Sequence, residues 1–122
     1  MPREHPPRDR DRVEHVLKAA REAVSFTTGR VEEDLESDRM LLRAVLHAVG
    51  EIGEAARHIS EQGRARFGPM DWRAIVGMRN VLVHVYWGVR TDRVWRTVQH
   101  DLPPLIAECE RVLSAWPPEP DE

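Results

Sequence analysis

The chain has 122 residues, a length typical of one domain. Hydrophobic residues make up 41% of it and charged residues 32%, which fits a small helical protein with a modest core and a strongly charged exterior. The net charge of −3 excludes an overall basic field, so any contact with nucleic acid must come from a few locally placed cations. A domain of this size buries only about two-thirds of its unfolded surface, so a dimer would add stability.

The cationic and cysteine residues set further bounds. Apart from Lys18, every basic residue is an arginine. Genomic base composition explains this bias, because the arginines are scattered over every segment, and a need for bidentate phosphate contacts is the alternative. The single cysteine, Cys109, excludes an intramolecular disulfide and fits a reducing compartment. No signal peptide and no apolar run of about 20 residues is present, so we expect a cytoplasmic protein without membrane association.

The two ends of the sequence contain almost nothing to bury. Residues 1–9 are rich in proline and charge, and we expect a flexible N-terminal tail there. Residues 117–122 form an acidic, proline-rich tail by the same reasoning. Residues 10–116 between them are expected to fold as one helical domain.

The first predicted helix spans about residues 10–26, because its apolar residues recur at steps of three and four. Gly29 is expected to stop it. Residues 31–37 are expected to add a short helical turn before the next long segment.

The second predicted helix begins at Ser37 or Asp38, either of which is a suitable N-cap, and runs to about Gln62. One side of this helix is apolar. The residues on that side are Leu41, Leu42, Val45, Val49, Ile52, Ala56 and Ile59. Residues 63–69 are predicted to form a loop.

The third and fourth helices complete the chain. Asp71 is predicted to cap a third helix over residues 72–87, which Gly88 ends. Thr91 or Asp92 is predicted to cap a fourth over residues 93–116. Since proline lacks an amide hydrogen, Pro103 and Pro104 are expected to kink or split it.

No segment shows the strict alternation of an exposed strand. The predicted fold class is therefore all-α, an up-down four-helix bundle with a kinked last helix. A symmetric homodimer is expected for so small a core.

The most apolar segment, GMRNVLVHVYWG at residues 77–88, also holds polar side chains. At about 100° per residue, Arg79 falls in the middle of one apolar side of the third helix. Asn80 and His84 are four residues apart and share an adjacent side with Arg73 and Gly77, a glycine that would let another backbone come close. A buried arginine is costly unless it is paired. It either forms a structural ion pair with a glutamate of the second helix, beside a core His84, or belongs to a functional site.

RNVLVHVY, residues 79–86, has the form Arg, four residues, His, one residue, Tyr. This pattern resembles the signature of HEPN-domain proteins, and the added tyrosine is similar to the HepT branch of toxins. The stretches EIGEAARHIS, DWRAIVGMRNVLVHVYWGV and VWRTVQHDLPPL resemble that family in the same order, so the resemblance covers about residues 10–116. It implies an all-helical, dimeric, metal-independent ribonuclease, whose motifs from two subunits meet across a symmetric groove.

The resemblance also implies roles for single residues. Arg79 and His84 would be the catalytic pair, and Asn80 the polar residue that follows the arginine. Tyr86 would be the regulatory tyrosine, to which a small MNT-domain nucleotidyltransferase antitoxin attaches AMP. The chain would then be the toxin of a type VII-like toxin–antitoxin system, with transfer RNA or messenger RNA as substrate and no cofactor.

The side chains suit that chemistry. RNA cleavage without metal uses the ribose 2′-OH as nucleophile, which requires proton transfer and a counter-charge for the phosphorane. An imidazole with an unperturbed pKa near 6.5, such as His84, transfers protons near neutral pH. Arg79 offers a fork of donors to phosphate oxygens, and Asn80 could orient the imidazole or hold a phosphate oxygen. AMP on Tyr86 would add bulk and negative charge where the substrate phosphate docks.

A stripe of four polar residues follows the second helix at steps of four, three and four: His47, Glu51, Glu54 and His58. The apolar residues lie on the opposite side, so the stripe is expected to face solvent. Glu51 and Glu54, together with Arg73 of the third helix, are candidates to line the substrate groove. A metal site is the remaining alternative, because helical bundles bind metals with such residues.

For several other tryptophans and arginines, the sequence allows either a structural role or a role in binding RNA. Trp87 and Trp95 are core or interface residues, or they stack on unpaired bases. Trp72 is predicted to be a core residue. The arginines at positions 90, 93 and 96 form a solvated helix face or guide a phosphate backbone. The rival to the enzyme as a whole is a non-catalytic HEPN-like module that binds a nucleotide or scaffolds a nucleotidyltransferase.

Overall fold

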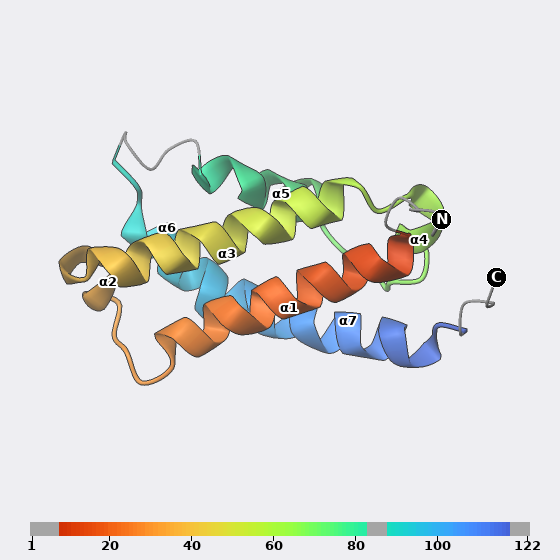
Figure 1. The fold of residues 1–122 in the computed structure, drawn as a ribbon, viewed down its shortest axis with the longest axis horizontal. Coiled ribbons are helices and arrows are strands. Elements are labelled where there is room, and N and C mark those ends of the chain that lie inside the picture. Colours follow the sequence, from red (N-terminus) through yellow and green to blue (C-terminus); the bar gives the residue numbers. More distant parts are fainter. Residues whose placement is uncertain (1–7, 83–87, 118–122) are drawn as a thin grey trace, which may run out of the picture.

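The computed structural model describes residues 8–82 and 88–117. All regular secondary structure in these two ranges is helical (Figure 1). The α-helices are α1 (Asp9–Thr27), α2 (Asp34–Ser37), α3 (Arg39–Arg57), α4 (Glu61–Arg64), α5 (Trp72–Gly77), α6 (Thr91–Arg96) and α7 (Leu102–Ala115), and two further segments are a 3₁₀-helix, η1 (Met78–Leu82), and a π-helix, η2 (Thr97–Asp101).

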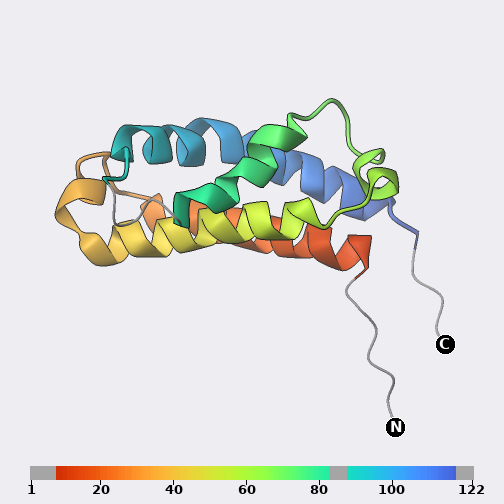
Figure 2. The ribbon, with the colours of Figure 1, turned by 90° about the horizontal axis from the view of Figure 1, so that it is seen from above.

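The two long helices α1 and α3 pack side by side, and α3 runs back along α1 (Figure 1). α7 covers another side of α1, while α5 and η1 lie against α3, as the view from above shows (Figure 2). The start of α1 and the end of α7 lie at the same end of the molecule. Side chains from α1, α3, η2 and α7 that are almost completely buried form the core: Val13, Ala20, Val45, Leu46, Ile52, Val98, Leu102, Leu105, Cys109 and Val112.

The all-α prediction is confirmed for the described residues. The four-helix bundle with a kinked last helix stays a prediction, because the second predicted helix ends early and the third changes its helical geometry. The structure contains one chain, so the homodimer stays a prediction. Among the described helices, none combines the length and the apolar character that a membrane span requires.

The first predicted helix is confirmed as α1, which begins one position earlier than residue 10. Val13, Val16 and Ala20 are buried, as their spacing predicts. Gly29 adopts a positive φ of 76°, a conformation that glycine reaches without strain, in the turn after the helix. The short helical turn is confirmed as α2. Residues 1–7 and 118–122, which hold most of the predicted tails, lie outside the described residues.

Asp38 is the N-cap of α3, where its side chain accepts a hydrogen bond of 3.1 Å from the amide of Leu41. The helix ends at Arg57, so the predicted continuation to Gln62 is wrong. Ser60 explains the difference, because it caps the short helix α4 by accepting from the Gly63 amide at 3.1 Å. The Ser60 amide in turn donates to Asp9 at 2.9 Å and ties this corner to α1.

The predicted third helix changes geometry halfway. Asp71 caps α5 as expected, accepting from the Ala74 amide at 3.0 Å. After Gly77 the chain tightens into the 3₁₀-helix η1, so a single α-helix over residues 72–87 is wrong for its described part; residues 83–87 lie outside the described ranges. This change occurs where the chain lies directly against α3, since η1 packs on that helix.

The predicted split of the fourth helix is confirmed. The two parts, α6 and α7, are joined by the π-helix η2, whose turn is wider than that of an α-helix. The Leu102 amide donates to the carbonyl of Thr97, five residues earlier, at the end of the π-helix η2. Pro103 and Pro104 follow in the first turn of α7, where a missing amide hydrogen breaks no helical bond. The predicted caps at Thr91 or Asp92 are wrong, because the helix begins at Thr91 and Arg90 precedes it without a side-chain cap.

Candidate functional site

Arg79 and Asn80 lie in η1, and both are exposed. The side chain of Arg79 is 45% exposed, so the predicted burial of this arginine is wrong. Helical geometry gives the reason: each residue advances about 100° in an α-helix but about 120° in a 3₁₀-helix. The tightening after Gly77 therefore shifts Arg79 around the helix axis from the position that a continuous α-helix predicts.

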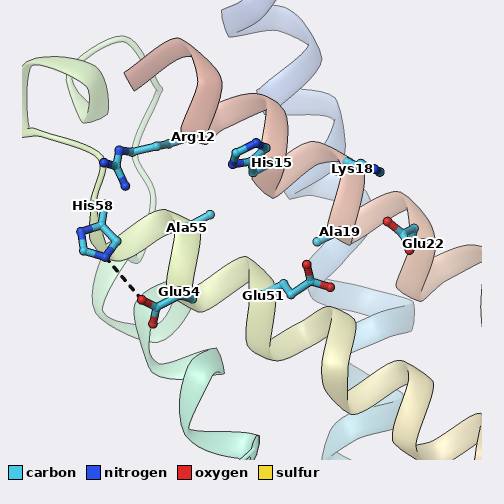
Figure 3. A pocket seen from close by; sticks show the side chains of 9 residues that line it. All are labelled: Arg12, His15, Lys18, Ala19, Glu22, Glu51, Glu54, Ala55 and His58. Carbon is cyan, nitrogen blue, oxygen red and sulfur yellow. Dashed lines mark hydrogen bonds and ion pairs between the residues drawn. The ribbon is translucent and has the colours of Figure 1, made fainter. Parts of the chain in front are cut away.

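Arg79 contacts the second long helix through Glu54. Its Nε lies 3.4 Å from Oε2 of the glutamate. The same carboxylate lies 3.6 Å from the guanidinium of Arg57 and 3.4 Å from Nε2 of His58 (Figure 3 shows the latter pair). The ion pair between the motif arginine and a glutamate of this helix, one of the two readings of the sequence, is thus present.

The exposure of this ion pair limits what it contributes to folding. The two side chains are 45% and 53% exposed, and half-exposed ion pairs stabilise a protein by about 0–1 kcal/mol. Within the described residues, the closest contact of the guanidinium with Glu54 is through Nε, and it is an ion pair for which no hydrogen bond is found. A guanidinium that is 45% exposed can still bind an anion, and stability alone does not account for the arginine.

Gly53 determines how closely the motif approaches α3. A Cβ atom at this position would overlap the backbone nitrogen of Arg79 and lie 2.8 Å from the carbonyl oxygen of Val76. Gly77, which we expected to admit another backbone, has no described residue within 4 Å of such an atom, so that expectation stays a prediction. The sequence carried a signal for Gly53, since a glycine inside a helix costs about 1 kcal/mol relative to alanine and usually has a packing reason.

A groove of about 440 Å³ lies between α1 and α3, next to Glu54 (Figure 3). α1 contributes Arg12, His15, Lys18, Ala19 and Glu22, and α3 contributes Glu51, Glu54, Ala55 and His58. The predicted solvent exposure of the polar stripe is confirmed, with side chains from 43% to 72% exposed. Arg73 is exposed on α5 and does not line this groove. The assignment of these residues to a groove between two subunits stays a prediction.

Within the stripe, each histidine forms an ion pair with a glutamate four residues away in the chain. His47 lies 3.3 Å from Glu51, and His58 lies 3.4 Å from Glu54. In the part of the chain that the structure describes, no group of three or more histidine, cysteine or acidic residues is arranged to hold a metal ion.

His84 and Tyr86 lie outside the described residues, as does Trp87. Their predicted catalytic, regulatory and stacking roles therefore stay predictions. What the structure describes of the motif is its first half, Arg79 and Asn80, on the surface beside α3.

A cavity of about 620 Å³ brings together the arginines that follow the motif. Its lining residues are Glu32, Arg90, Asp92, Arg93, Trp95, Arg96 and His100. Arg90 is paired with Asp92 at 2.9 Å, whereas Arg93 and Arg96 have no described partner. Trp95 is half-buried and packs against the core, which favours its core reading over base stacking.

Trp72 is confirmed as part of the hydrophobic packing. It contacts Phe67 edge to face, with ring centroids 4.9 Å apart, and the guanidinium of Arg64 lies 5.1 Å from its ring. This cluster holds the loop before α5, so it positions the start of the motif segment.

Cys109 and Glu108 are neighbours with opposite pKa shifts, and neither belongs to the motif. Burial raises the pKa of the Cys109 thiol to about 12, so this cysteine is not a nucleophile at neutral pH. Hydrogen bonds from Arg111 and from the Gly68 amide lower the pKa of Glu108 to about 2. Glu108 thereby anchors the loop before α5 to α7.

Comparisons with known proteins agree with the motif. The family profile described as Ribonuclease HepT-like matches residues 16–112. The protein named "Putative RNase MJ1380" from Methanocaldococcus jannaschii is 33% identical over 97 residues, which cover 80% of this chain and 89% of that protein. "Probable ribonuclease HepT" from Thermococcus cleftensis is 31% identical over 103 residues, covering 84% of this chain and 94% of that protein. No solved structure matches the chain significantly.

Proposed function

Because this chain belongs to the HepT-like ribonuclease family, we propose that it is an endoribonuclease and the toxin of a type VII-like toxin–antitoxin pair. Relatives named as ribonucleases, covered over most of their length, support the RNA-cleaving activity. The observation that carries the proposal to particular residues is the exposed guanidinium of Arg79, whose closest contact with Glu54 is through Nε.

The proposed reaction needs no external nucleophile. His84 takes the proton of a ribose 2′-OH, the oxygen attacks the adjacent phosphorus, and the bond from phosphorus to the 5′-oxygen breaks. The leaving oxygen receives a proton from an imidazole, so the products carry a 2′,3′-cyclic phosphate and a 5′-hydroxyl. One His84 could serve both steps, or two copies in a homodimer could divide them.

Arg79 and Asn80 have complementary parts in this scheme. The phosphorane carries an additional negative charge on its equatorial oxygens, and a positioned guanidinium stabilises that charge more than it stabilises the ground state. Asn80, exposed next to it in η1, supplies an uncharged donor and acceptor for a phosphate oxygen or for the imidazole. These groups and an imidazole provide the proton transfer and counter-charge that the reaction needs, so we propose that it is metal-independent.

Tyr86 is the proposed control point. A cognate MNT-domain nucleotidyltransferase would attach AMP to its hydroxyl through a phosphodiester, with pyrophosphate leaving from ATP. The modification adds bulk and a negative charge two residues beyond His84, where it opposes the docking of an RNA phosphate. The substrate class we propose is cellular RNA, transfer RNA or messenger RNA, in the cytoplasm.

Growth of a bacterial host that expresses the wild type, His84→Ala or Tyr86→Phe tests the proposal. The wild type should arrest growth and create new RNA ends, and His84→Ala should do neither while remaining folded. With the nucleotidyltransferase co-expressed, the wild type should become harmless and Tyr86→Phe should stay toxic. Healthy growth and intact RNA in all three strains would instead support the non-catalytic scaffold.

A further inference from the structure

We infer that Glu54 is a positioning residue for Arg79: it holds the Nε edge of the guanidinium, so that the two terminal amino groups face the RNA phosphate. This inference rests on the proposed ribonuclease function and adds a residue to its site. The observation behind it is the contact of 3.4 Å between Nε of Arg79 and Oε2 of Glu54.

The glutamate stands on a rigid support. Ile52 and Ala56, two residues before and after it, are completely buried in the core. The last turn of α3 is therefore fixed by packing, and the carboxylate projects from a part of the helix that cannot shift without disturbing the core. Groups held by a regular, packed element are placed more accurately than groups on a loop.

The backbone of Arg79 is held by the same turn of α3. Because Gly53 lacks a side chain, the amide nitrogen of Arg79 and the carbonyl of Val76 lie directly against the helix. Gly53 thus determines the position of the Arg79 backbone, and Glu54 determines the orientation of its guanidinium. Two consecutive residues of α3 control both ends of one side chain.

The chemistry of the guanidinium explains why a carboxylate at Nε is useful. Arginine carries five N–H donors in a rigid plane, and Nε bears one of them. A carboxylate on the Nε side leaves the four donors of the terminal amino groups for phosphate oxygens and restrains the guanidinium by ion pairing. Lysine has a single ammonium and cannot be oriented in this way.

The charges around Glu54 fit the same role. A carboxylate next to an RNA phosphate would repel it, but Glu54 also contacts Arg57 and His58. Glu54, Arg57 and Arg79 together carry a net charge of +1. The local charge therefore still attracts an anion.

The test compares Glu54→Gln with Glu110→Gln in purified full-length protein cleaving RNA. Glu110 is a matched control, because it is 51% exposed and pairs with Arg21 of a different helix at 2.7 Å, far from the motif in sequence. Glu54→Gln should lower kcat by about 10- to 100-fold with a smaller change in KM, since misplacement of a catalytic group by about 1 Å costs about that much. Glu110→Gln should leave both constants unchanged.

A second variant background distinguishes a positioning role of Glu54 toward Arg79 from a general effect of Glu54 on activity. In an Arg79→Lys protein the Nε donor is absent, so Glu54→Gln should add little further loss to the residual rate. Full additivity of the two changes would overturn the inference. So would wild-type kinetics for Glu54→Gln in an enzyme that otherwise cleaves RNA.

A readout independent of cleavage is the Nε–Hε resonance of Arg79 in ¹⁵N-labelled protein, assigned by its loss in Arg79→Lys. It should shift in Glu54→Gln and stay in place in Glu110→Gln. An unmoved resonance in Glu54→Gln overturns the inference whatever the activity. If the resonance moves but the wild type leaves RNA intact, the proposed function fails and the contact is a structural ion pair, which also ends the positioning role.

Discussion

The two halves of this small domain are built differently. α1 and α3 are regular helices of 19 residues each, whose apolar stripes are buried along their length. The region from Trp72 to Asp101 has six-residue α-helices, a 3₁₀-helix and a π-helix, and it carries the Arg79 motif. Local sequence rules and the fold agree in the first region and conflict in the second. Such conflict is expected where residues are selected for a function as well as for folding.

The regions also differ in what their polar residues do for stability. Core side chains of α1 and α3 such as Val13, Val45 and Ile52 are completely buried, whereas Arg79 of the second region is half exposed. Burial of apolar groups dominates the free energy of folding, and half-exposed ion pairs add little. Stability therefore belongs mainly to the regular helices, and the proposed activity belongs to residues that can be changed without unfolding the protein.

The largest expected effect comes from Arg79→Ala. Loss of the group that stabilises the phosphorane should reduce kcat for RNA cleavage by about 10²- to 10³-fold. The thermal midpoint should hardly change, because the side chain is exposed. Arg21→Ala is the matched control, since Arg21 is 56% exposed and also pairs with a glutamate. Equal loss of activity in the two variants would contradict the separation of the two regions.

Gly53→Ala should lower both stability and activity, because Gly53 lies in the regular helix α3 and packs against the backbone of the motif. The added Cβ would overlap the backbone of Arg79, so the segment must move. We expect a loss of about 1–3 kcal/mol in unfolding free energy, the usual cost of overpacking. We also expect at least a tenfold fall in kcat. Gly77→Ala, whose Cβ has open space, should keep wild-type stability in chemical denaturation. A wild-type midpoint for Gly53→Ala would disprove the close approach.

Glu108→Gln should show a pH-dependent loss of stability. The hydrogen bonds from Arg111 and the Gly68 amide lower the folded-state pKa of Glu108 to about 2, below its ordinary value of 4.5. Its contribution is therefore complete above pH 4.5 and is lost as the pH falls toward 2. The thermal midpoints of wild type and variant should differ at pH 7 and converge over that range. A difference that persists unchanged at pH 2 would show that the carboxylate charge is not responsible.

The smallest expected effect is that of Arg93→Ala combined with Arg96→Ala. These arginines have no described partner and line the cavity that follows the motif. If they guide the RNA backbone, KM should rise a few-fold with kcat unchanged, and the salt dependence of RNA binding should weaken. Unchanged KM and salt dependence would leave them as a solvated face.

The regular region could be predicted from the sequence because its signals are local. Asp38 is a side chain that caps α3, and the apolar spacing places α1 within one residue of its observed start. The end of α3 could not be predicted as well, because Ser60 tolerates both a helix and a cap. Its hydrogen bond to Asp9, distant in sequence, favours the cap.

The sequence predicted which residues form the candidate site, but it predicted their arrangement in space only in part. A helical wheel assumes one helical geometry, so it could not show that η1 shifts Arg79 around the helix axis. That shift accompanies the close approach at Gly53, a tertiary contact that no local pattern contains. The pairing of Arg79 with a glutamate of α3 was one of two readings, and the partner proved to be Glu54.

Cleavage of RNA by the purified chain, in the presence of EDTA, tests the central claim most directly. We predict that the wild type leaves 2′,3′-cyclic phosphate and 5′-hydroxyl ends, and that His84→Ala, folded to the same thermal midpoint, leaves the RNA intact. Intact RNA with the wild type, or the same ends at the same rate from His84→Ala, would contradict the assignment of the motif as a metal-independent ribonuclease site.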